Sequence, residues 1–300
     1  MKFILNEYNL YSPKIEKKLD VMCITDIHSN VEKLKIISKI IKKLQIKIVL
    51  ISGDLTDMVT DKRNEELLLV LKDIAKNSYI YIVKGNHDII KARTKKKGNI
   101  TLENKFYNKI SSLDNVKLFN NNIDTIELNK DITISSLTLP LEWYKKKEKI
   151  NYFNKYINND IKINNKKFNI LLSHTPKPFI KDDLIRKDMG TFSDMDLILC
   201  GHMHAGLKPF CLRKNNNHRG LIGPYKTLFP KEAYGFYDND DSSLIISGGV
   251  TKISYLRLGK KVTKFFDNMF VSEIELIHLK PSKKHNFELL KRTIKKEQLY

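Results

Sequence analysis

Residues that could bind metal ions gather in five short segments of this 300-residue chain. The segments are Asp26-Ile27-His28, Gly53-Asp54-Leu55-Thr56-Asp57, Gly85-Asn86-His87-Asp88, His174 and Gly201-His202-Met203-His204. Five of the eight histidines lie in them, next to Asp, Asn and Gly residues. Carboxylate, amide and imidazole ligands with one shared carboxylate can hold two divalent cations about 3.5–4 Å apart, an arrangement used for the hydrolysis of phosphate esters. The clustering predicts a two-metal hydrolytic centre.

The acidic and amide residues suit different positions in such a centre. Asp26 and His28 can converge on one ion if the chain leaves a strand between them. Asp54 follows Gly53, where the backbone can turn closely, and its two carboxylate oxygens can serve two cations. Asn86 adds a neutral oxygen. Taken singly, each motif could equally be a helix cap, a turn or a buried polar residue, but together they favour a metal centre.

The histidines divide into ligands and a proton donor. On an extended backbone, His87 should face away from the amide that precedes it, which leaves its imidazole available to donate a proton. By the same rule His202 and His204 should point the same way, with Met203 packed behind them. His174 completes the set of imidazoles.

The elements that position these segments can be predicted from periodicity. Apolar runs at residues 19–25, 48–51 and 79–83 each end at one of the segments, and helical spacing of apolar residues follows at 31–44 and 62–76. Three successive strand–loop–helix units predict parallel strands with right-handed crossovers. Their ligand sites lie beyond the carboxyl ends of the strands.

Shorter elements are expected after residue 90, without internal repeats. Helices are expected at 106–113 and from Trp143 to Tyr156, and strands at 116–119, 125–128, 132–137, 168–172, 197–200 and 244–247. The last twenty residues are charged and mildly helical in character. No linker separates the five segments, so we expect one catalytic domain over residues 1–280 with an insert at about 90–167, followed by a charged tail at 281–300.

Composition and net charge limit the classes of protein to which this chain can belong. The chain is 41% hydrophobic and 29% charged, as is typical of globular domains, and it carries a net charge of +20. The excess is mostly Lys spread along the chain, which favours a solvated basic surface over a nucleic-acid site and leaves peripheral membrane contact open. No protein partner can be inferred.

Cysteine usage and hydropathy bear on disulfides, structural zinc and location. Three cysteines without a CxxC pair predict neither a disulfide framework nor a structural zinc site, and Cys23 and Cys200 lie in apolar runs typical of a core. Neither a signal peptide nor a run of roughly 18 apolar residues is found, so a cytoplasmic location is expected.

From Leu19 to Thr251 the chain resembles the calcineurin-like metallophosphoesterase family, whose five blocks DxH, GDxxD, GNHD, a lone His before Thr-Pro, and GHxH appear in order. The resemblance implies an α/β fold, a four-layer αββα sandwich with a dinuclear metal site at the carboxyl ends of the strands. It implies that one ion is held by Asp26, His28, Asp54 and His204, and the other by Asp54, Asn86, His174 and His202. It also implies that His87 is the catalytic imidazole, oriented by Asp57.

Two branches of this family can be compared with the chain. Protein phosphatases carry arginines in GDxxDRG and RGNHE, but Met58 and Lys84 stand at those positions, which disfavours this activity. The segment from residue 201 to 250 is more similar to the bacterial phosphodiesterase branch with a GHTHGGQ signature, some members of which act at membranes or on lipid-linked pyrophosphates. Met203 and Ala205 depart from that signature.

These observations predict a metal-dependent phosphoesterase that hydrolyses phosphodiester, phosphomonoester or pyrophosphate bonds of a phosphate-ester substrate. The nucleophile would be a water or hydroxide between the two cations, with its pKa lowered by their charge. Oxygen and imidazole ligands without thiolates favour Mn, although Fe, Zn, Co and Ni suit the same residues. The alternatives are a nuclease, for which the basic charge would supply affinity, and a non-catalytic binding protein that keeps the fold.

Overall fold

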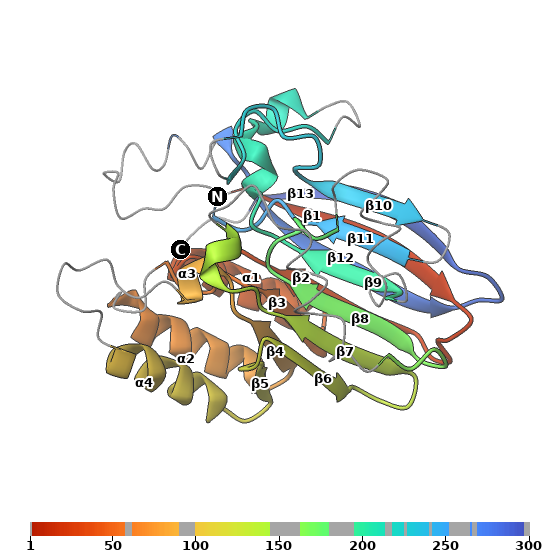
Figure 1. Ribbon diagram of the computed structural model, residues 1–300, viewed down its shortest axis with the longest axis horizontal. Helices are drawn as coiled ribbons and strands as arrows, with labels where there is room; N and C mark the ends of the chain where they lie inside the picture. The colour runs from red at the N-terminus through yellow and green to blue at the C-terminus, as the bar shows by residue number, and fades with distance from the viewer. Residues whose placement is uncertain are drawn as a thin grey trace.

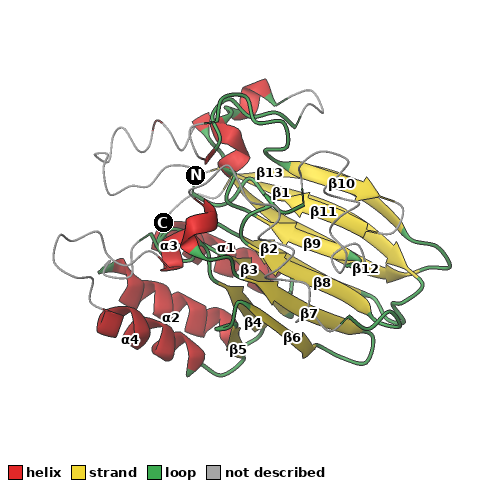
Figure 2. Ribbon diagram, in the orientation of Figure 1, coloured by secondary structure: helices red, strands yellow, loops and turns green. Residues whose placement is uncertain are grey.

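The computed structural model describes residues 2–57, 62–89, 100–144, 163–179, 195–213, 218–224, 227–239, 242–251, 265 and 269–296. Over these ranges the chain forms two β-sheets with helices packed against one of them (Figures 1 and 2). None of the described helices has the length and apolar character needed to cross a membrane. The mixed α/β architecture with two large sheets agrees with the predicted fold class.

The seven-stranded sheet carries the first three metal-binding segments. Its strands, in spatial order, are β13 (Asn286–Lys296), β1 (Lys2–Ser12), β12 (Ser272–Pro281), β2 (Leu19–Ile24), β3 (Ile48–Ser52), β4 (Tyr79–Val83) and β5 (Val116–Leu118). Strands β2 to β5 are parallel, as the strand–loop–helix repeats predict. Parallel pairing brings the carboxyl ends of β2, β3 and β4 to one edge of the sheet.

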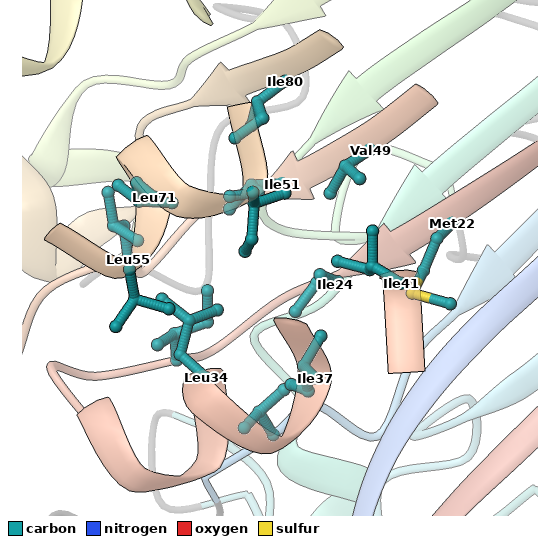
Figure 3. Close-up of a cluster of buried hydrophobic side chains, with 14 of the residues drawn as sticks. Met22, Ile24, Leu34, Ile37, Ile41, Val49, Ile51, Leu55, Leu71 and Ile80 are labelled. Atoms are coloured by element: carbon teal, nitrogen blue, oxygen red, sulfur yellow. The ribbon is translucent and has the colours of Figure 1, made fainter. Parts of the chain in front are cut away.

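Helices α1 (Val31–Lys43), α2 (Arg63–Ala75) and α4 (Ile100–Ser111) cover one face of this sheet (Figure 2). Helix α1 starts at an Asn30 cap, whose side chain accepts a hydrogen bond from the backbone N–H of Lys33. Its apolar residues, such as Leu34 and Ile37, recur at helical spacing and pack on Ile24 and Ile51 of the sheet (Figure 3). The predicted helices at 31–44 and 62–76 are confirmed, and the one predicted at 106–113 begins earlier, at Ile100.

The six-stranded sheet carries the other two segments. Its order is β10 (Gly235–Asn239), β11 (Ser242–Ile246), β9 (Leu197–Cys200), β8 (Phe168–Ser173), β7 (Ile132–Leu137) and β6 (Ile123–Glu127). The two sheets bury a shared core that includes Cys23 and Leu50 from one side and Ile170 and Leu199 from the other. On the outer face of the six-stranded sheet, Cys200 packs in a further buried cluster. Both Cys23 and Cys200 are therefore core residues, as predicted.

Short 3-10 turns lie at the strand ends of the six-stranded sheet. They are η1 (Leu141–Tyr144), η3 (His204–Leu207) and η4 (Phe210–Leu212), and the four-residue α3 (Asn86–Ile89) follows β4. The rest of the helix expected from Trp143 to Tyr156 lies outside the described residues. Residues 100–144, within the expected insert, supply α4, β5, β6 and β7 and so connect the two sheets.

The ends of the chain differ from the sequence-based expectation. The helical character expected for the last twenty residues is wrong over β13, which pairs antiparallel with β1 so that Lys2 lies opposite Lys296. Phe287 of β13 is buried and stacks on Tyr8 of β1, with ring centroids 5.4 Å apart. Pairing with a strand from the other end of the chain outweighs the local helical preference of Lys and Glu.

Candidate metal centre

The five predicted segments meet where the carboxyl ends of β2, β3 and β4 face those of β8 and β9. Three groups of side chains there have ligand atoms within 4.8 Å of one another. The groups are Asp26 with His28 and His204, Asp54 with His174 and His202, and His28 with Asp57 and His87. The structure thus brings together eight of the nine predicted site residues in these groups. The ninth residue, Asn86, is the first residue of α3 and lies beside these groups. The backbone N–H of the following residue, His87, donates a hydrogen bond to Asp54 Oδ1 at 2.8 Å.

Asp54 belongs to the second group and also faces the first. Its Oδ2 atom is 3.1 Å from His174 Nε2 in one group and 3.6 Å from His28 Nε2 in the other. Gly53, which has φ +84°, allows this approach, because a Cβ on it would stand 2.6 Å from the His174 ring. One oxygen of Asp54 therefore faces imidazoles from both sheets.

Asp26 is held in the same way. Its Oδ2 atom accepts hydrogen bonds from Thr25 Oγ1 at 3.0 Å and from the backbone N–H of His202 at 3.1 Å. Its Oδ1 atom lies 3.7 Å from His28 Nε2 and 3.6 Å from His204 Nε2. In each carboxylate, one oxygen is anchored by the protein and the other is directed at imidazole nitrogens.

Buried atoms without hydrogen-bond partners test whether this donor set suits cations. Among the described residues, such atoms at the site include Asp26 Oδ1, Asp54 Oδ2, His28 Nε2, His174 Nε2 and Asn86 Oδ1. Unpartnered buried polar atoms cost about 1–3 kcal/mol each, so several in one place need a reason. Divalent cations supply one, because carboxylate, amide and imidazole atoms all donate lone pairs to metals. The residues present fit a metal site.

The electrostatics of the site favour positive charge. Burial raises the pKa of Asp26 and Asp54, but neighbouring imidazoles outweigh it and hold both pKa values well below the usual range. Burial lowers the pKa of His174, yet the charge of Asp54 raises it to about 9. Burial and the charge of His174 hold the pKa of His202 well below its usual value. Metal ions would take the place of these protons.

His87 differs from the other imidazoles because its side chain is 34% exposed. Its Nδ1 atom lies 3.0 Å from the backbone carbonyl oxygen of Asp57 and 3.4 Å from Asp57 Oδ1. Burial lowers the pKa of His87, but the hydrogen bond to Asp57 and the charge of Asp54 raise it to about 10. A cationic imidazole at the edge of the site can donate a proton outward.

The backbone of the site is not extended, which corrects two expectations. His202 and His204 have φ of 67° and 46°, so their common direction does not come from strand-like alternation. Asn86 and His87 lie in the helical turn α3 rather than in an extended loop. Eight of the eleven described non-glycine residues with positive φ belong to the three loops after β2, β3 and β9: Asp26, His28, Ser29, Asp54, His202, His204, Ala205 and Leu207. Such strain clusters at functional sites. Met203 is buried in the outer cluster, behind the site as predicted.

Asp88 is a supporting residue whose contacts were not predicted from the sequence. Its buried carboxylate accepts hydrogen bonds from the backbone N–H groups of Leu55, Thr56 and Gly85 and from Thr56 Oγ1. It therefore ties the loop after β3, which carries Asp54, to the loop after β4. An acidic residue at the end of the GNHD segment was the only available signal.

Ser52 is a second supporting residue, and it joins the two sheets. Its carbonyl oxygen accepts from Thr25 Oγ1 at 2.8 Å and is 2.9 Å from His174 Nδ1, which leaves Nε2 of that ring to face Asp54. Its Oγ atom is 2.9 Å from the carbonyl oxygen of Ser173 and 2.8 Å from that of Leu199. No feature of the sequence marks this serine.

Three solved structures are similar to parts of this chain. The chain is 14% identical to a purple acid phosphatase from yellow lupin. The match covers 79% of this chain and 45% of the phosphatase chain, with a TM-score of 0.43. The chain therefore spans less than half the length of that enzyme. It is 11% identical to TT1561 of Thermus thermophilus, over 78% of this chain and 90% of that one, with a TM-score of 0.46. A dimetal phosphatase from Danio rerio gives 9% identity, 78% and 89% coverage, and a TM-score of 0.40.

The family assignment rests on the sequence. No curated protein matches the chain. Residues 19–206, more than half of the chain and all five metal-binding segments, match the calcineurin-like phosphoesterase family. Members of such a family are hydrolytic phosphoesterases, and the groups of His and Asp side chains agree with a divalent metal site. The chain belongs to the calcineurin-like phosphoesterase family.

Proposed function

We propose that this chain is a dinuclear metal-dependent phosphoesterase that hydrolyses phosphodiester bonds. The supporting observation is the position of Asp54 Oδ2, which lies 3.1 Å from His174 Nε2 on one side and 3.6 Å from His28 Nε2 on the other. A carboxylate in that position can serve two cations at once. Both flanking groups already hold imidazoles directed at it.

The proposed ligands of the two ions are the two groups of side chains that contain Asp26 and Asp54, with Asn86 added and Asp54 shared. One ion would be held by Asp26, His28, Asp54 and His204, and the other by Asp54, Asn86, His174 and His202. The absence of thiolates from this set favours Mn as the native metal. Bound there, the two cations would activate water for attack on phosphorus and offset charge on the phosphoryl oxygens.

His87 and Asp57 would carry the proton transfer. The protonated imidazole of His87 is positioned to hydrogen-bond a phosphoryl oxygen and to donate a proton to the leaving oxygen. Asp57 holds Nδ1 of this ring through its carbonyl oxygen, which leaves Nε2 to act on the substrate. Asp57 also contacts His28 Nδ1 at 3.7 Å, so it would orient a ligand and the proton donor together.

The surroundings of Lys84 support a diester over a monoester. Lys84 occupies the place where protein phosphatases of this family carry an arginine, and its Nζ atom lies 4.4 Å from the centroid of the Tyr107 ring. A cation engaged with an aromatic ring is less available to grip phosphate. A monoester carries one more negative charge than a diester, so it depends more on such a grip.

Hydrolysis of bis-p-nitrophenyl phosphate and p-nitrophenyl phosphate by the Mn-loaded protein tests the proposal. We expect turnover of the diester to exceed that of the monoester. His87→Ala should lower kcat by about 10²–10⁴-fold while two equivalents of Mn remain bound, as measured by elemental analysis. His278→Ala is the matched control, since that histidine is bonded to Asp20 on β2, away from the site. Full activity of His87→Ala would contradict its role, and failure of the wild-type chain to take up two metal equivalents would contradict the dinuclear centre.

The net charge of +20 supports a nuclease as a second candidate. Binding to phosphate backbones releases counterions, so affinity for generic DNA should then fall steeply with salt. Measuring DNA binding and cleavage over a salt series separates the two proposals. Salt-independent or undetectable binding removes the nuclease.

A further inference from the structure

Exposed apolar side chains concentrate in the segment that follows the last metal-binding loop. We call residues 205–213, 218–224 and 227–230 the apolar lobe. In Figure 1 this segment (turquoise, after β9) rises above the ends of the sheets. Of ten large hydrophobic side chains that are exposed among the described residues, four belong to it: Leu212 (56%), Ile222 (47%), Leu228 (71%) and Phe229 (62%). Concentrated exposure of this kind marks interaction surfaces.

The apolar lobe is attached directly to the metal centre. Gly206 lies two residues after His204, and its carbonyl oxygen accepts from the backbone N–H groups of Leu221 at 2.7 Å and Ile222 at 3.0 Å. Its backbone also approaches Gly220 so closely that a Cβ on Gly206 would lie 2.3 Å from Gly220 Cα. Whatever contacts the lobe is therefore held close to the site.

Backbone contacts between two segments of the apolar lobe display the apolar residues. Ile222 and Leu228 form an antiparallel bridge, so their side chains lie on one side of the ribbon. The backbone N–H of Phe229 donates to the carbonyl oxygen of Leu221 at 2.9 Å. Phe229 has φ 50°, an uncommon conformation for a bulky residue, and its ring is nonetheless presented to solvent. The hydrogen bonds hold these side chains outward instead of letting them collapse into the core.

The charge around the apolar lobe is strongly positive. Residues 205–234 contain one acidic residue, Glu232, and six basic residues: Lys208, Arg213, Lys214, Arg219, Lys226 and Lys231. Arg213 is buried against Glu273, but Arg219 and Lys231 are exposed beside the apolar side chains. Apolar residues rimmed by cations match the boundary between acyl chains and anionic headgroups.

Other occupants fit the apolar lobe less well. A second copy of the chain would bring two strongly basic segments together, and like charges at an interface oppose association. Nucleic acid would match the charge, but three of the four exposed side chains are aliphatic and offer no stacking surface for bases. An anionic lipid surface satisfies both the charge and the aliphatic character.

We propose that the apolar lobe docks on anionic phospholipid bilayers, with Leu228 and Phe229 entering the interfacial region and the metal centre held at the membrane surface. This goes beyond the proposed catalytic function and does not depend on it. Docking is expected of the metal-free and the metal-loaded chain alike. It is reversible, since a few side chains and cations give interfacial binding and not insertion across the bilayer.

Cosedimentation with lipid vesicles tests the proposal. The full chain is mixed with vesicles of phosphatidylcholine alone and of phosphatidylcholine with phosphatidylglycerol. We expect binding to the anionic vesicles only, and a loss of at least about tenfold in the partition coefficient for Leu228→Glu combined with Phe229→Glu. Leu69→Glu is the control, because Leu69 is 65% exposed on α2, outside the apolar lobe. It adds one negative charge, whereas the double variant adds two. A conservative pair, Leu228→Ser with Phe229→Ser, removes the apolar side chains without adding charge and should also weaken binding.

Three outcomes overturn the proposal. The first is no binding of the wild-type chain to anionic vesicles. The second is equal binding of wild type and both double variants, which would leave the basic charge alone responsible. The third is a dimer that the double variants abolish, seen by analytical ultracentrifugation without lipid, which would assign the surface to a second copy. Circular dichroism and Mn content confirm that each variant is folded, and hydrolysis of a water-soluble diester should stay unchanged in all of them.

Discussion

The two sheets contribute different chemistry to the candidate metal centre. The loops of the seven-stranded sheet supply every carboxylate and the amide, together with two imidazoles: Asp26, His28, Asp54, Asp57, Asn86 and His87. The loops of the six-stranded sheet supply imidazoles only: His174, His202 and His204. One sheet therefore provides the negative charge and the other completes the donor set. The site exists only where the sheets pack, so metal binding and sheet packing should be coupled.

Removing the central carboxylate should have the largest effect, because the six-stranded sheet has no replacement for it. We expect Asp54→Asn to lower kcat/KM for a diester by at least about 10³-fold, since the neutral amide cannot serve two cations. Metal uptake, measured by elemental analysis after dialysis against Mn, should fall below two equivalents. Asp124→Asn, on β6 and away from the centre, should behave as wild type. Two tightly bound equivalents in Asp54→Asn would show that the charge is supplied elsewhere.

Removing an imidazole from the six-stranded sheet should have a smaller and partly reversible effect. His174→Ala leaves the carboxylates in place, so Mn affinity should fall by at least about 10–100-fold, and activity should recover in part at high Mn. Isothermal titration with Mn and activity over a metal series measure both. His285→Ala serves as the control, since His285 lies beside Ser243 and not in the centre. An unchanged isotherm would mean that the sheets do not share the metal site.

Asp88 connects two loops of the seven-stranded sheet, so its variant tests the contribution of that sheet alone. Asp88→Asn offers fewer acceptor sites to four donors, so the loops after β3 and β4 should lose their fixed spacing. We expect kcat to fall about tenfold, with weaker affinity for one of two Mn ions and little change in KM. Separate binding constants from titration distinguish this positioning role from general destabilisation. Equal weakening of both ions, together with a lower melting temperature, would indicate a structural role only.

The sequence predicts local features of this fold better than distant ones. Strands β2, β3 and β4 and helices α1 and α2 follow from periodicity over a few residues, and the polar segments that end those strands point to the candidate site. The pairing of β1 with β13 joins residues nearly 300 positions apart, and no local pattern encodes it. The same holds for backbone geometry: left-handed φ at His202 and His204 depends on tertiary contacts, so the directions of these rings were predicted for the wrong reason.

Supporting contacts were harder still to predict. The roles of Asp88 and Ser52 depend on which backbone groups lie near them after folding. A buried carboxylate bonded to three N–H groups looks, in the sequence, like any Asp in a turn. The residues that hold a site together are thus less visible than those that could carry its chemistry.

Ser52→Ala should give the smallest effect and test the coupling between the sheets most directly. The Ser52 hydroxyl lies within hydrogen-bond distance of carbonyl oxygens on both β8 and β9, so its loss should lower the free energy of unfolding by about 0.5–1.5 kcal/mol. Urea unfolding with EDTA measures this. With Mn at about 100 times its Kd, metal binding should add about 2.7 kcal/mol to the wild type. If the hydroxyl sets the spacing between the sheets, Mn should add less to Ser52→Ala. An equal gain would show that the metal ligands fix that spacing themselves, without the serine.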